Sequence, residues 1–267
     1  MNTLPCLLGA ALAAAVIPAF AQIPEPVNGG VVMGHHHVLV SEADYDAHRR
    51  LWIDALGART AMLGSMEVLL LPDTIILLRK REPQGGSEGT SLNHIAFLVR
   101  DLAATEARWR AAGGEVTDRR PSPAQLFVRF PGGLSVELIE DPKLAVPAAH
   151  HHIHFYTASP EQTRDWYAKT FGAKPGMRGR FLAADMPGAN LSFSQAEGVA
   201  AGTKGRALDH TGFEVDGLEE FCRRLEASGV KLDAPYRQLP QYGIAIAFLT
   251  DPWGTYIELT EGLDKLR

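Results

Sequence analysis

The sequence predicts an α+β protein built from four copies of a strand–helix–three-strand module. The first observation behind this prediction is spacing, because His37, His94, His152 and His210 follow one another at intervals of 57, 58 and 58 residues. The second is that each histidine opens a short apolar stretch and is followed, 19 or 20 residues later, by a glycine suited to end a helix. Matched spacings in four places indicate an internal repeat.

A helix is expected in every module, between the histidine strand and the glycine. Each helix follows a side chain that can accept a hydrogen bond from the free backbone N–H groups. The expected N-caps are Asp44, Asp101, Ser159 and Asp216, and the closing glycines are Gly57, Gly113, Gly172 and Gly229. In the fourth helix, apolar residues recur at i, i+3, i+4 and i+7 from Leu218 to Leu225, which predicts one face packed on a sheet.

Short apolar strands follow each glycine and complete the module. They are predicted at 66–71 and 74–80, 126–130 and 134–140, 180–186 and 191–195, and 244–249 and 255–261. One module buries too little apolar surface to fold alone, so we expect neighbouring modules to pair. This gives two domains, residues 33–141 and 150–262, joined by a linker that contains Pro142 and Pro147.

The first 21 residues have the pattern of a cleavable signal peptide. Residues 7–20 are apolar or small, too few to span a bilayer, and an Ala-Phe-Ala cleavage site ends at Ala21. No lysine or arginine precedes the apolar run, so an uncleaved anchor is the alternative. We expect cleavage and a periplasmic or secreted protein with no membrane segment. Cleavage would remove Cys6 and leave Cys222 without an intramolecular disulfide partner.

Composition restricts the class of partner. The chain has 26 basic and 31 acidic residues, a formal net charge of −5 and no long basic run, so nucleic acid is not an expected partner. With 46% hydrophobic and 21% charged residues, the chain is globular rather than disordered. We expect a small-molecule substrate and a monomer or homodimer.

Glutamates near the end of the even-numbered modules supply candidate metal ligands. Glu137 and Glu258 lie on last strands, where alternation places both acids opposite the apolar set. The odd-numbered modules have no acid at this place. The two sets that would converge in paired modules are His37, His94, Glu137 and His152, His210, Glu258. Two imidazoles and one carboxylate leave open coordination positions, which suit Fe²⁺, Mn²⁺, Ni²⁺, Co²⁺ or Zn²⁺.

Histidine-led first strands and glutamate-bearing last strands, repeated in this way, resemble the vicinal oxygen chelate superfamily over about residues 33–262. The superfamily includes glyoxalase I, fosfomycin-resistance thiol transferases, bleomycin-resistance proteins and type I extradiol dioxygenases. The resemblance implies four βαβββ modules paired into two glyoxalase-like domains. It also implies the two sets above as metal ligands, because metal-using members take ligands from first strands and from late strands.

These relatives differ in chemistry, and three functions stay open. The resemblance favours an exported, divalent-metal-dependent lyase or isomerase of glyoxalase type, acting on a small oxygen-rich molecule through a 2-His-1-Glu site. A ring-cleaving dioxygenase is less favoured, because Phe127 and Phe248 stand ten residues before the glutamates, where extradiol enzymes carry a tyrosine. A non-catalytic binding or resistance protein would keep the fold without the metal.

The second half offers more groups that could move protons. His154 follows His152 on the same strand face, where the first half has Leu39 as the expected counterpart. We predict His154 and Tyr156 as catalytic residues, although a supporting or ligand role for His154 stays open.

Other residues are assigned from their surroundings in the sequence. We expect Arg237, Tyr242 and Phe248 to contact substrate. The histidines that flank the first strands, His35, His36, His150 and His151, are interpreted as solvated residues with little functional weight.

Overall fold

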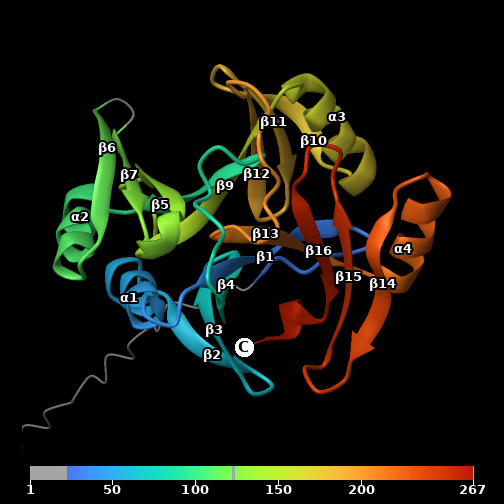
Figure 1. Cartoon of the computed structure of the whole chain (residues 1–267), viewed down its shortest axis with the longest axis horizontal. Helices are drawn as coiled ribbons and strands as arrows, with labels where there is room; N and C mark the ends of the chain where they lie inside the picture. The colour runs from blue at the N-terminus through green and yellow to red at the C-terminus, as the bar shows by residue number, and fades with distance from the viewer. Residues whose placement is uncertain (1–22, 122–123, 267) are drawn as a thin grey trace, which may run out of the picture.

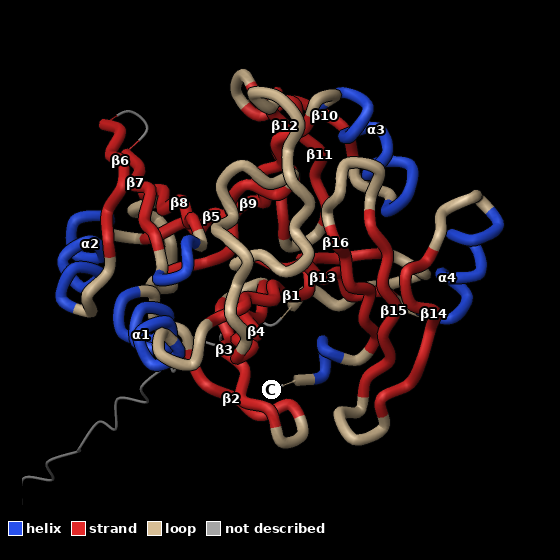
Figure 2. Tube along the Cα trace, in the orientation of Figure 1, coloured by secondary structure: helices blue, strands red, loops and turns tan. Residues whose placement is uncertain are grey.

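The computed structural model describes residues 23–121 and 124–266, and it contains two eight-stranded sheets (Figures 1 and 2). The predicted signal peptide, residues 1–21, lies outside the described residues. The α+β class and the repeated βαβββ module are confirmed. Among the described residues, no helix has both the length and the apolar character needed to cross a bilayer.

The first sheet combines the first and fourth modules. Its order is β14-β15-β16-β13-β1-β4-β3-β2. From the first module come β1 (Val31–Val40), β2 (Arg59–Leu63), β3 (Met66–Leu71) and β4 (Thr74–Lys80). From the fourth come β13 (Leu208–Val215), β14 (Leu232–Leu239), β15 (Ile244–Thr250) and β16 (Tyr256–Glu261). The two modules meet where β1 pairs antiparallel with β13.

The second sheet combines the second and third modules in the order β10-β11-β12-β9-β5-β8-β7-β6. From the second module come β5 (Leu92–Val99), β6 (Glu115–Pro121), β7 (Ala124–Arg129) and β8 (Ser135–Glu140). From the third come β9 (Ala148–Thr157), β10 (Lys174–Arg178), β11 (Phe181–Met186) and β12 (Ala189–Gln195). The seam is the antiparallel pair of β5 and β9. The strands of neighbouring modules, which we expected to pair, therefore lie in different sheets.

Helices connect the modules that are neighbours in sequence. They are α1 (Tyr45–Arg50), which continues into a π-helical turn (Leu51–Ala55), α2 (Leu102–Ala111), α3 (Pro160–Phe171) and α4 (Leu218–Ala227). Trp52, from the π-helical turn, contacts Phe97 of the second module at 5.6 Å between ring centroids. Phe171 of α3 contacts Phe213 of the fourth module at 5.0 Å. Neighbouring modules thus pack through helices while their strands join other partners.

The helix caps follow the sequence only in part. Asp101 caps α2 by accepting a hydrogen bond from the Ala104 N–H. Asp216 does not cap α4, since Gly217 stands at that position and Asp216 instead accepts from the Gly29 N–H. This contact ties the fourth helix to the segment before β1.

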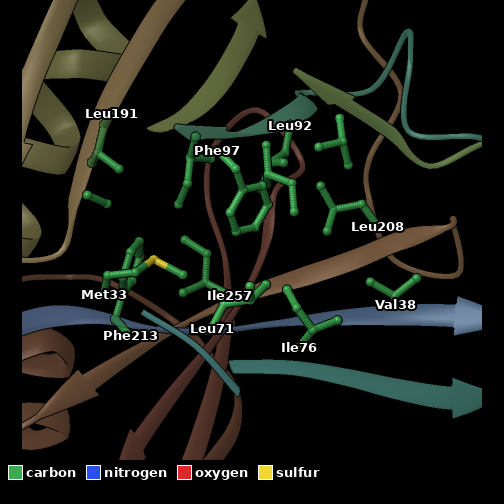
Figure 3. Close-up of a cluster of buried hydrophobic side chains, with 14 of the residues drawn as sticks. Met33, Val38, Leu71, Ile76, Leu92, Phe97, Leu191, Leu208, Phe213 and Ile257 are labelled. Carbon is green, nitrogen blue, oxygen red and sulfur yellow. The ribbon is translucent and has the colours of Figure 1, made fainter. Parts of the chain in front are cut away.

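The larger of the two apolar clusters among the described residues lies between the two sheets (Figure 3). Met33, Phe213 and Ile257 come from the first sheet, and Leu92 and Phe97 come from the second. Because the other face of β1 is turned away from this core, alternate residues of that strand are free to build a site.

A buried pair of histidines joins the sheets through this interface. His36 Nε2 lies 3.1 Å from His150 Nε2, and His150 Nδ1 donates to the Gly188 carbonyl at 3.0 Å. Burial lowers the pKa of His150 to about 3. The interpretation of His36 and His150 as solvated is wrong, because both are almost fully buried.

Candidate metal centres

Each candidate site lies at the seam where two modules share a sheet. In the first sheet, His37 of β1 stands directly opposite His210 of β13. In the second sheet, His154 of β9 stands opposite His94 of β5. Irregular pairing flanks the histidines in both seams, and such bulges commonly re-aim side chains next to functional sites.

Site 1 consists of His35, His37, His210 and Glu258. His35 Nε2 and His210 Nε2 each lie 3.0 Å from Glu258 Oε2, and His37 Nε2 lies 3.7 Å from the same oxygen. The rings of His37 and His210 stack at 4.2 Å between centroids. One ligand atom from each of the four residues lies within 4.8 Å of the others.

The charges of site 1 are coupled. Burial alone would raise the pKa of Glu258, but hydrogen bonds from His210 and His35 hold it well below its usual range. Burial alone would lower the pKa of His210, but hydrogen bonds to Asp209 and Glu258 raise it. Burial and the neighbouring His210 keep the pKa of His37 well below its ordinary value. The site is therefore one buried carboxylate surrounded by imidazoles.

Asp209 orients the His210 ring from behind. Its Oδ1 accepts a hydrogen bond from His210 Nδ1 at 2.6 Å, and its Oδ2 accepts from the Gly205 N–H at 2.5 Å. With Nδ1 held in this way, Nε2 of His210 is directed at Glu258. A carboxylate behind a ligating imidazole fixes the ring and raises its basicity.

Site 2 consists of His94, His152, His154 and Glu137. One nitrogen from each of the three imidazoles lies within 4.8 Å of the others. His152 Nε2 and His94 Nε2 lie 3.3 and 3.4 Å from Glu137 Oε2. Burial alone would raise the pKa of Glu137, but interactions with His152 and His94 lower it below its ordinary value. Burial lowers the pKa of His154 to about 2, so this imidazole is neutral.

The environment of site 2 is less anionic than that of site 1. Asn93 takes the place of Asp209, with its Oδ1 2.9 Å from His94 Nδ1. Ala96 takes the place of Gly212 in the strand register. Gly212 lies under the His35 ring, which an added Cβ would overlap. The glycine thus lets His35 approach Glu258 closely.

A register rule explains where the carboxylates stand. Glu258 pairs with Gly212, two residues after His210, and Glu137 pairs with Ala96 in the same way after His94. In the odd modules the same register holds Arg79 and Ser194. In each sheet, one of the two equivalent positions therefore holds a glutamate and the other holds a different residue. The odd module contributes two histidines to the site, and the even module contributes one.

Both sites fit a divalent cation. Nε2 of His94 and Nε2 of His152 are buried without a hydrogen-bond partner among the described residues, although both lie near the Glu137 carboxylate. In site 1, three imidazole nitrogens surround one carboxylate oxygen. Imidazole and carboxylate donors suit several divalent first-row metals.

The predicted ligand sets are wrong in their grouping. His37 lies with His210 and Glu258, while His94 and Glu137 lie with His152. The reason is the exchange of sheet partners, since the first module joins the fourth and the second joins the third. Every predicted ligand is nevertheless in one of the two sites.

His35 is the ligand candidate that the sequence interpretation discounted. It is fully buried and bonds Glu258, so the interpretation as solvated is wrong. His151 is partly buried, with its Nδ1 2.9 Å from His152 Nδ1. The sequence does carry a signal, because His35 and His37 recur 117 residues later as His152 and His154.

The same spacing corrects the expected counterpart of His154, which is His37 and not Leu39. Each stands opposite the histidine of an even module. His154 Nε2 lies 2.8 Å from Ser194 Oγ, and its ring is 4.9 Å from the ring of Tyr156. This position within the cluster favours the ligand role that the sequence left open.

The three residues expected to contact substrate gather at site 1. Arg237, Tyr242 and Phe248 all line a cavity of about 450 Å³ that also exposes Glu258 and its three histidines. The expected catalytic residues, His154 and Tyr156, belong to site 2. The sequence therefore assigns substrate contacts and proton transfer to one site, whereas the fold places them in separate sheets.

Known proteins share this architecture. The family model described as the Glyoxalase/Bleomycin resistance protein/Dioxygenase superfamily matches residues 149–259. No curated protein matches the chain. Glyoxalase I from Zea mays is 18% identical with a TM-score of 0.70, over 88% of this chain and 94% of that one. A candidate dioxygenase from Bacillus subtilis subsp. subtilis str. 168 is 14% identical with a TM-score of 0.64, over 91% of this chain and 86% of that one.

At these identities the structural likeness concerns the fold, and the fold likeness extends over both sheets. The family model matches the sequence of the third and fourth modules. Residues 149–259 therefore match the glyoxalase/bleomycin resistance protein/dioxygenase superfamily in sequence, and 88% of the chain shares the fold of glyoxalase I from Zea mays.

Proposed function

We propose that the protein is a divalent-metal-dependent enzyme of glyoxalase type, a lyase or isomerase, that acts on a small oxygen-rich molecule at site 1. The observation that carries this proposal is the convergence of three imidazole nitrogens on one buried carboxylate at the wall of a 450 Å³ cavity. A cavity of this size, mostly apolar with a few convergent polar groups, suits a small substrate.

His35, His37, His210 and Glu258 would hold the metal. When bound, a divalent ion supplies Lewis acidity that polarises substrate oxygens. Asp209 holds the His210 ring in one orientation, and Glu258 is the single anionic ligand of the set. Apolar side chains form much of the cavity lining and would pack against the body of a substrate.

Site 2 is proposed as a second metal centre. His94, His152, His154 and Glu137 would hold the ion, and Tyr156 is the phenol placed beside the cluster to hydrogen-bond a ligand. Asn93 in place of Asp209 leaves this site with less negative charge behind its ligands. We expect site 2 to bind metal more weakly than site 1.

Ring cleavage by a dioxygenase is the second candidate. Phe248 lies 5.6 Å from the His210 ring and Phe127 lies 5.3 Å from the His94 ring, so both stand beside the clusters without a hydroxyl group. This position disfavours a reaction that needs a phenol there. A non-catalytic binding or resistance protein is the third candidate.

Elemental analysis of untagged protein, followed by reconstitution with each of the five ions, tests the proposal. The reconstituted protein is then screened with hemithioacetals and, under oxygen, with catechols. We expect a bound divalent ion and turnover that Glu258→Gln abolishes, with Glu137→Gln as the matched variant in site 2. Oxygen uptake with a catechol would replace the proposal by ring cleavage. A folded, metal-free protein that still binds ligands would leave only the binding function.

We also propose that the protein is exported, on the basis of the signal-peptide pattern in residues 1–21. An extracytoplasmic location disfavours a dependence on glutathione, which is mainly cytosolic.

A further inference from the structure

The cavity at site 1 is lined by both apolar and cationic side chains. Its apolar lining includes Leu63, Met66, Leu77, Ile246, Phe248 and Leu263. Arg79, Lys80 and Arg237 also line the cavity, and Glu258 is the one carboxylate among the lining residues. A ligand that fits this cavity must therefore combine an apolar body with groups that satisfy cations.

Arg79 stands next to the candidate ligands. It occupies the register position that holds Glu258 in the fourth module, and its charge helps to lower the pKa of His37. The side chain is exposed, and it makes no hydrogen bond or ion pair within the part of the chain that the structure describes. A guanidinium thus replaces the acid that the twofold arrangement of the sheet would place there.

Arg237 reaches the same cavity from β14. It lines the cavity together with Leu239, while Tyr236 and Gln238, on the opposite strand face, line a different groove. Within the described ranges it also makes no hydrogen bond or ion pair. Lys80 differs from both arginines, since its amino group bonds Glu42 at 2.6 Å.

The charges of the cavity favour an anion. Three cations line it beside one carboxylate; Lys80 is paired with Glu42, and Glu258 is already engaged by His35 and His210. Both arginines are exposed and have no acidic partner among the described residues, so a bound anion would give the guanidinium groups a charged partner that the chain does not supply. Guanidinium binds carboxylate through two parallel hydrogen bonds, and this pairing is among the strongest in proteins.

We propose that the site 1 cavity takes a carboxylic acid with an apolar body. Arg79 and Arg237 bind the carboxylate, and the apolar lining packs against the body. This proposal rests on the proposed function only in that a metal would be bound beside the ligand. The two arginines and the apolar lining belong to the chain itself and do not depend on a metal.

Calorimetric titration with mandelate, methyl mandelate and glycolate tests the proposal in metal-free and Co²⁺-loaded protein. We expect mandelate to bind more tightly than both probes, since methyl mandelate lacks the charge and glycolate lacks the apolar body. Arg79→Met and Arg237→Met should each weaken mandelate binding by about 5- to 10-fold without weakening Co²⁺ binding. Lys80→Met is the matched control and should leave mandelate binding unchanged.

Equal binding of mandelate and methyl mandelate, or equal losses in Lys80→Met and the two arginine variants, would overturn the proposal. If Co²⁺ fails to bind while the metal-free protein keeps the mandelate preference and its dependence on both arginines, the proposed function fails and the substrate class stands.

Discussion

Replacing Asp209 with asparagine should weaken divalent-metal binding at site 1 by about 10- to 100-fold. Asp209 accepts one hydrogen bond from His210 at 2.6 Å and a second from the Gly205 N–H at 2.5 Å. A hydrogen bond to a charged group contributes about 1.5–3 kcal/mol, and a tenfold change in affinity corresponds to about 1.4 kcal/mol. Loss of the charge behind His210 therefore gives the stated range, even if the asparagine oxygen still accepts from Nδ1.

The assay is a competition titration with a chromophoric chelator, and each site is measured alone. Asp209→Asn is measured in protein that also carries His94→Ala and His154→Ala, which remove site 2. The reciprocal change, Asn93→Asp, is measured in protein that carries His35→Ala and His37→Ala, which remove site 1. Asn93→Asp should strengthen metal binding at site 2.

Unchanged affinity in Asp209→Asn, in protein whose affinity does fall with Glu258→Gln, would refute the role given to Asp209. A parallel loss of affinity in Asn93→Asp would show that these positions act through folding and not through charge.

Three further predictions concern a glycine, a buried histidine and the N-terminal segment. Gly212→Ala should displace the His35 ring and lower metal affinity at site 1 by about 10-fold or more, which the same chelator titration measures; an unchanged affinity would exclude His35 as a ligand. Burial lowers the pKa of His48 to about 4, so stability from the neutral ring is present above pH 6.5 and is lost as pH falls toward 4. Urea unfolding at pH 7 and pH 5 measures this loss. Between the two pH values the free energy of unfolding should fall by about 2 kcal/mol less in His48→Gln, which keeps a donor for the Pro131 carbonyl, than in the unchanged protein. Equal losses in the two proteins would contradict the burial argument. The intact mass of the exported protein should lack residues 1–21, and a full-length chain in the cytoplasm would contradict export.

The module could be predicted from sequence because its determinants are local. Histidine-to-glycine spacing, helix patterning and short apolar runs all lie within about 58 residues, and the predicted strands at 66–71 and 74–80 coincide with β3 and β4. The choice of sheet partner is not local. Evenly spaced modules allow neighbours to pair or to exchange, and the outcome depends on which seam strands meet across the fold.

The ligand types could also be predicted, but their grouping could not. His210 and Glu258 belong to one module, so their proximity follows from the register of β13 and β16. His37 joins them only because β1 pairs with β13. His35 depends in addition on Gly212, whose missing side chain makes room for the ring, and such cross-strand contacts have no sequence period.

Charges near the ligands were visible in the sequence but had no assigned role. Asp209 directly precedes His210, and Arg79 directly precedes Lys80 at the end of a strand. Only the strand register shows that Arg79 stands where another module has its glutamate. The fold therefore determines whether such a charge supports a ligand, binds an anion or faces solvent.

Anomalous diffraction from crystals of Co²⁺-loaded protein tests the central claim most directly, because it locates the ion among the side chains. We predict a peak in the first sheet, at about 2.0–2.2 Å from Nε2 of His35, His37 and His210 and from the Glu258 carboxylate. A fully loaded crystal with no peak at these four residues, or with cobalt bound only elsewhere, would contradict a metal centre formed by the first and fourth modules.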